Sequence, residues 1–173
     1  MKGKKNSKVF ILVFLGMLTA FGPFVTDMYL STLPAMSDYF HTTSSMVQLG
    51  LTASMIGLAA GQLLFGPLSD KYGRRLPLII SMALFAVATI GCIYSHTIMQ
   101  FVGWRLVQGI AGAGGIVISR SVAADKYAGR ELAKMLALIG AINGVAPVAA
   151  PMGGGFLAGS VGWIGIFWCL FVL

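Results

Sequence analysis

Three charged side chains interrupt otherwise apolar stretches of this 173-residue sequence, and they are its best candidates for chemistry. Asp27 lies near the end of the first apolar run, whereas Arg105 and Arg120 lie within the fourth. A charge at the centre of a membrane span costs about 2.5–3.5 kcal/mol, so it should face a bundle interior or a watery cavity and have a partner. A carboxyl group in such a place can gain and lose a proton, which is what a proton-coupled carrier needs.

The composition makes the bilayer the solvent for this chain. Hydrophobic residues are 57% and charged residues only 10% of the sequence, whereas about a quarter of the residues of a soluble domain are charged. Continuous rather than alternating apolar runs select helices, because each backbone amide in hydrocarbon must be satisfied within its own segment. We therefore predict an all-α, polytopic membrane bundle.

The apolar runs predict five membrane spans and part of a sixth. Small residues recur every fourth position in the second, at Ala53, Gly57 and Gly61, so this face should pack closely against another helix. The sixth run has 13 residues, short of the roughly 20 that are needed to cross. The predicted spans are about 9–33, 46–68, 76–94, 98–124, 132–158 and, incomplete, 161–173.

The basic residues predict the orientation. Of twelve Lys and Arg, four precede the first span, three lie between spans two and three, and three follow span four. The links after spans one, three and five have none. Because loops rich in Lys and Arg stay in the cytoplasm, the N-terminus and the hydrophilic hairpin 66–75 should be cytoplasmic.

This orientation places Asp27 and Arg105 at similar depth near the outer ends of their spans. We predict that they lie close together in the outer half of a central cavity, to which Gln108 also contributes. Burial disfavours the charged carboxylate and the guanidinium favours it, so protonation of Asp27 can follow its surroundings. The alternative is a static ion pair that only orients two helices. Arg120 lies nearer the inner end, where the favoured interpretation is that it reaches the headgroups.

Several function classes are disfavoured. The sequence has no phosphate-binding loop, nucleophile elbow or metal-spaced histidine pair, so neither an enzyme nor a metal site is expected. The net charge of +7 is spread over the ends of the apolar runs and forms no patch suited to nucleic acid. No cofactor is expected, and a proton gradient would supply the energy.

Three motifs carry a resemblance to a known family. The hairpin resembles the major facilitator superfamily signature between spans two and three, with matching residues Gly66, Asp70, Gly73, Arg74 and Arg75. The stretch 105–113, with Arg105 and Gln108, resembles the superfamily's second motif in span four. Span five resembles its antiporter motif through Gly144, Pro147, Pro151, Gly153 and Gly154. Prolines remove backbone donors and should bend this span.

The stretches 26–34 and 162–168 are similar to the bicyclomycin and chloramphenicol resistance branch of the drug:proton antiporters. The resemblance implies the N-terminal half of a twelve-span multidrug exporter in a bacterial inner membrane. Asp70 and Arg74, with Asp125 as a further acidic partner, would lock its cytoplasmic side, and Arg105 would help to handle protons. The bent fifth span would form the interface with the C-terminal half-bundle.

The partners implied are the lipid bilayer, protons and amphipathic drug-like molecules. A single half should not transport alone, because alternating access rocks one repeat bundle against another. Three alternatives stay open: a superfamily carrier for another small solute, a truncated membrane protein that does not transport, and a half-size carrier that pairs with a second chain.

Overall fold

The computed structural model describes residues 2–30 and 32–172, and these residues are almost entirely helical, with no β-strand among them. The all-α prediction is therefore confirmed. The helices are α1 (Lys2–Leu30), α2 (Leu33–Tyr39), α3 (Ser44–Tyr72), α4 (Arg75–Ile93), α5 (Ile98–Lys126) and α6 (Gly129–Val172).

Three of these helices, α3, α4 and α5, are long and apolar enough to cross a membrane. Each covers the range predicted for a span to within a few residues. Threonines begin two of them: the Thr43 hydroxyl accepts a hydrogen bond from the Met46 amide, and the Thr97 hydroxyl accepts one from the Gln100 amide. The short helix α2 was not predicted, and its first turn contains Pro34, a residue well suited to a helix start.

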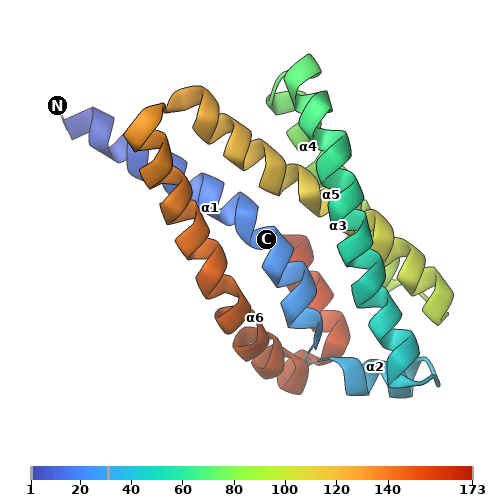
Figure 1. Cartoon of the computed structure of the whole chain (residues 1–173). Helices are drawn as coiled ribbons and strands as arrows, with labels where there is room; N and C mark the ends of the chain where they lie inside the picture. Colours follow the sequence, from blue (N-terminus) through green and yellow to red (C-terminus); the bar gives the residue numbers. More distant parts are fainter. Residues whose placement is uncertain (1, 31, 173) are drawn as a thin grey trace.

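Helix α6 covers two predicted spans as one continuous helical element, and it changes direction within its length (Figure 1). Contacts at both ends agree with a reversal. Met135 belongs to the same buried cluster as Leu15 of α1, whereas Trp163 packs against Tyr39 at the other end of the bundle. Phe167, one turn further on, lies beside Arg105, so the last segment of α6 runs back into the bundle.

The closest helix contact joins α3 to α5 through glycines. A Cβ on Gly57 would overlap the carbonyl oxygen of Leu106, and one on Gly61 would overlap that of Ile110. Gly109 of α5 is equally close to the Ser54 carbonyl. The predicted small-residue face of span two is therefore confirmed as a packing interface, because only glycine permits this backbone approach.

Two ends of the bundle matter for function. The α2 end has an aromatic cluster in which Phe40, Phe101 and Phe167 surround Trp163 with ring centroids 5.7–6.4 Å apart. The opposite end, called here the hairpin end, holds the link between α3 and α4. The predicted hairpin 66–75 is mostly helical, since α3 continues to Tyr72 through Pro67. Gly73 makes the turn with φ of +78°, a conformation that favours glycine.

Candidate functional site

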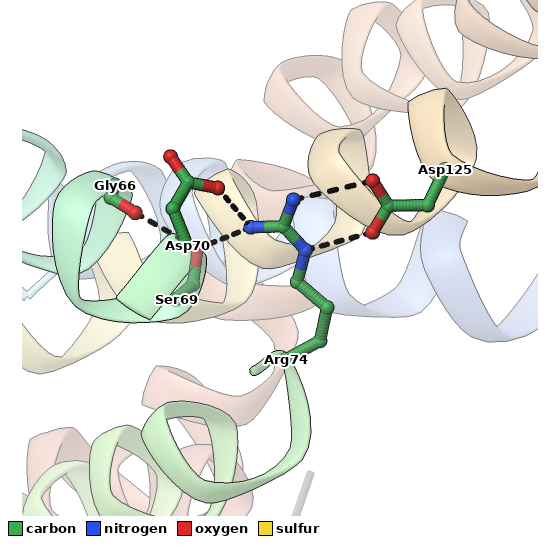
Figure 2. A network of polar contacts seen from close by, with 5 residues as sticks. All are labelled: Gly66, Ser69, Asp70, Arg74 and Asp125. Carbon is green, nitrogen blue, oxygen red and sulfur yellow. Dashed lines mark hydrogen bonds and ion pairs between the residues drawn. The ribbon is translucent and has the colours of Figure 1, made fainter. Parts of the chain in front are cut away.

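The hairpin end holds a network of charged side chains centred on Arg74, which we call the Arg74 cluster: Ser69, Asp70, Arg74 and Asp125 (Figure 2). Arg74 Nε donates to Asp125 Oδ2 over 2.8 Å, and Nη2 donates to Asp125 Oδ1 over 3.2 Å. This two-bond geometry is the strongest form of an arginine–carboxylate pair. The guanidinium also bonds Asp70 and the Ser69 hydroxyl, which in turn donates to the Gly66 carbonyl.

The cluster ties three helices together at one place. Asp70 lies in the last turn of α3, Arg74 directly precedes α4, and Asp125 is next to last in α5. The hydrogen bonds that Arg74 donates to Asp125 and to Asp70 raise the pKa of Arg74 above its ordinary value, so the guanidinium stays charged. Arg75, which belongs to the same predicted motif, is exposed and takes no part in this network.

Arg105 lies in the middle of the bundle near the α2 end and is fully buried. Its guanidinium donates to Gln108 Oε1 over 2.7 Å and to the Ser54 hydroxyl over 3.2 Å. The aromatic ring of Tyr29 stacks against it, with the guanidinium carbon 4.6 Å from the ring centroid. A cation over an aromatic face is stabilised by the ring's quadrupole, more strongly when it is desolvated.

Gln108 continues this buried network toward α4. Its Nε2 donates to the Thr89 hydroxyl over 2.8 Å, and Thr89 donates to the Phe85 carbonyl over 2.8 Å. The Tyr29 hydroxyl donates to the Val47 carbonyl over 2.6 Å, which holds the ring that covers Arg105. Arg105 and Gln108 are therefore parts of the packed interior, and neither lines the cavity that was predicted to contain them.

The predicted pairing of Asp27 with Arg105 is not found: no ion pair joins them in the described ranges 2–30 and 32–172. The reason is helix geometry. Asp27 and Tyr29 are two residues apart on α1 and so point about 200° apart around its axis. Because Tyr29 faces Arg105, Asp27 must face elsewhere.

Asp27 instead lines a cavity of about 450 Å³ between α1, α3, α5 and α6, which we call the α1–α5 cavity. Polar side chains reach it from all four helices: Asp27, Gln62, Arg120 and Asn143. Apolar residues, among them Met55, Leu58 and Ile116, form the rest of its wall. This mixture of an apolar wall and a few polar groups is typical of small-molecule sites.

Only one hydrogen bond joins polar side chains of the α1–α5 cavity within the described residues. The Thr26 hydroxyl donates to Asp27 Oδ1 over 3.1 Å. Within the part of the chain that the structure describes, the side chains of Gln62, Arg120 and Asn143 make no hydrogen bond or ion pair. The Asn143 side-chain oxygen is buried without a partner.

A comparison with protein families matches residues 9–173 to the model of the Major Facilitator Superfamily. The chain belongs to this superfamily. It is 42% identical over 161 residues to the uncharacterized MFS-type transporter YdgK of Bacillus subtilis, an alignment of 92% of this chain and 40% of that protein.

Two further relatives have names that refer to drug resistance. A chloramphenicol resistance protein of Pseudomonas aeruginosa is 35% identical over 142 residues, 82% of this chain and 34% of that protein. A bicyclomycin resistance protein homolog of Haemophilus influenzae is 30% identical over 170 residues, 98% of this chain and 42% of that protein. The predicted resemblance to this drug-resistance branch of the superfamily is thus confirmed, and the chain spans about two fifths of the length of these relatives.

Not every residue of the superfamily motifs can be placed. Gly144 of the antiporter motif is exposed, with open space where a Cβ would lie. The side chains of Pro147 and Pro151, and the surroundings of Gly153 and Gly154, lie outside the described residues.

Sequence reasoning missed Gln62 and Asn143 as cavity residues and favoured a headgroup position for Arg120. An uncharged amide side chain within an apolar run is only weak evidence that the residue lines a cavity. Arg120 gave a stronger signal, because it is a charge within an apolar run, but its place near the inner end of that run favoured the headgroups.

Proposed function

We propose that this bundle is the N-terminal half of a proton-coupled drug exporter in a bacterial inner membrane. The observation that carries the proposal is the α1–α5 cavity, where the Asp27 carboxylate and an apolar wall share one space within a major facilitator fold. A drug in this cavity and a proton on Asp27 would compete. Inward proton flow would then drive the drug out.

The resistance names of two relatives support drugs as the substrate class. The Arg74 cluster supports a role for the hairpin end as a cytoplasmic lock, because a network that joins three helices stabilises one arrangement of them. The positive hairpin and N-terminal tail support a cytoplasmic position for that end. A superfamily carrier for another small solute remains the second candidate, because the wall of the cavity is apolar and generic.

The test uses everted membrane vesicles that contain the full-length transporter, meaning these residues joined to the C-terminal half-bundle. An imposed proton gradient should drive chloramphenicol uptake, and a protonophore should abolish it. Asp27→Asn should reduce the driven uptake to the level of vesicles without the transporter, because the group that exchanges protons is gone. Asp38→Asn, which removes an exposed carboxylate on α2, is the matched control. Full gradient-driven uptake by Asp27→Asn would refute the coupling role.

We also propose that these residues do not transport alone. Reconstituted by itself, the chain should give no gradient-driven uptake, since the opposing half of the cavity is supplied by a second bundle. The intact mass of the native product, extracted from its membrane, is the decisive companion measurement. A mass that matches only these 173 residues would favour a half-size carrier or a protein that does not transport.

A further inference from the structure

The α1–α5 cavity carries two opposite charges, and this balance restricts what it can bind. Asp27 and Arg120 are its only charged lining residues among those described, so the part of the wall that these residues form has a formal charge of zero. The other polar groups that face it, from α3 and α6, are the uncharged amides of Gln62 and Asn143. A cavity for simple lipophilic cations would be expected to carry a net negative charge.

The two charges lie at different depths. Gly22 of α1 is level with Ile116 of α5, whose Cδ1 lies 2.8 Å from where a Cβ on Gly22 would be. These helices are antiparallel, so Asp27 lies five residues from this level toward the α2 end and Arg120 lies four toward the hairpin end. With a rise of about 1.5 Å per residue, their backbones are at least about 13 Å apart along the bundle. This separation agrees with the absence of an ion pair between them in the described residues.

The separation leaves each charge available to a ligand. The Asp27 carboxylate accepts hydrogen bonds, whereas Arg120 can only donate them. A ligand that lies along the cavity therefore meets an acceptor on Asp27, a donor on Arg120, and an apolar wall that includes Met55, Leu58 and Ile116. A lipophilic monocation would be attracted by Asp27 but repelled by Arg120, whereas a monoanion would be repelled by Asp27 and attracted by Arg120.

We propose that Arg120 is a specificity-determining residue, and that with Asp27 it selects electrically neutral or zwitterionic amphiphiles. The donor end of the ligand, bearing hydroxyl, amide or ammonium groups, lies at Asp27. The acceptor end, bearing carbonyl, nitro or carboxylate groups, lies at Arg120. This assignment rests on the proposed function, since it defines the substrate class of the same cavity.

The test measures equilibrium binding to the detergent-solubilised full-length transporter, without a proton gradient. The probes are radiolabelled chloramphenicol, which is neutral, with tetraphenylphosphonium and tetraphenylborate as competitors of nearly equal shape and opposite charge. The wild type should bind chloramphenicol at least about tenfold more tightly than either ion, the scale that one charge-assisted hydrogen bond provides.

Charge removal should then change the selectivity in opposite directions. Arg120→Gln should weaken the binding of chloramphenicol by about tenfold. It should strengthen the binding of tetraphenylphosphonium by a similar factor, since the negative charge of Asp27 is left uncompensated. Asp27→Asn should instead strengthen the binding of tetraphenylborate. Arg120→Lys keeps the charge and should keep the neutral selectivity. Arg130→Gln, at an exposed position at the start of α6, is the control and should change nothing.

A wild type that binds either ion as tightly as chloramphenicol, or does not bind chloramphenicol, overturns the proposal. Parallel changes in the affinities of all three probes in Arg120→Gln also overturn it, because a loss of fold or of packing would act that way. If Arg120→Gln does not fold, the tetraphenylborate result in Asp27→Asn decides. The two proposals fail separately: charge-dependent selectivity without gradient-driven uptake refutes antiport alone, and uptake without selectivity refutes only the role of Arg120.

Discussion

The Arg74 cluster and the α1–α5 cavity share two helices, α3 and α5, but their polar groups differ in how they are paired. Helix α3 supplies Asp70 to the cluster and Gln62 to the cavity, and α5 supplies Asp125 and Arg120. In the cluster the guanidinium has two carboxylate partners. In the cavity the guanidinium has neither hydrogen bond nor ion pair within the described residues.

The difference indicates that the two regions have different roles. A paired charge stabilises one arrangement of the helices that it joins, whereas an unpaired charge in a cavity is free to bind something that comes and goes. The buried network of Arg105, Gln108 and Thr89 is a third case, because its polar groups serve packing and orientation. The Arg74 cluster, the α1–α5 cavity and the network of Arg105 thus differ in how their polar groups are paired and buried.

Within the Arg74 cluster, removal of Arg74 itself should have the largest effect. Arg74→Ala in the full-length transporter should lower gradient-driven uptake by roughly tenfold, because the equilibrium between conformations loses the contact that joins α3, α4 and α5. Arg74→Lys should restore only a part of this, since an ammonium group cannot form the two-bond pair with Asp125.

Chloramphenicol binding at equilibrium separates this effect from damage to the cavity. Arg74→Ala should bind chloramphenicol as tightly as the wild type, whereas Arg120→Gln should bind it about tenfold more weakly. If Arg74→Ala lost binding as well, the two regions would be one functional unit and the comparison would be wrong. Arg130→Ala is the matched control, because it removes a basic residue that is exposed at the start of α6.

A smaller effect should distinguish the two acidic partners of Arg74. Asp125 accepts two hydrogen bonds from the guanidinium and joins it to α5, whereas Asp70 accepts one and lies four residues away in sequence. Asp125→Asn should therefore reduce uptake more than Asp70→Asn. Equal losses, measured in the same vesicles at matched expression, would show that the link between α3 and α4 matters as much as the link to α5.

The smallest expected effect tests the packing that both regions share. Gly109→Ala places a methyl group against the Ser54 carbonyl and should cost about 1–3 kcal/mol of stability, the usual range for overpacking. The melting temperature of the purified protein should fall. Gly103→Ala lies on the same helix with no atom within 4 Å and should leave it unchanged or slightly higher. An equal fall in both variants would mean that the α3–α5 contact does not depend on this glycine.

Much of the fold could be predicted because the relevant signals are local. Apolar runs gave the helices α3, α4 and α5, and the four-residue spacing of Ala53, Gly57 and Gly61 gave the face that packs on α5. The motif with Arg74 could be identified by its resemblance to a family. Two features of the helices were not predicted. Helix α2 is too short to appear as an apolar run, and the prolines and glycines of α6 did not indicate one continuous helix.

The sequence by itself determined which residues are charged within apolar segments, how far along its helix each of them lies, and which face of α3 has side chains small enough for close packing. Only the tertiary structure decided which residues meet. It placed Tyr29 rather than Asp27 against Arg105, and it brought Arg120 and Asn143 to the cavity of Asp27. The physical reason is that depth follows from counting residues along a helix, whereas a partner depends on how each helix is rotated about its axis. That rotation is set by the packing of the whole bundle.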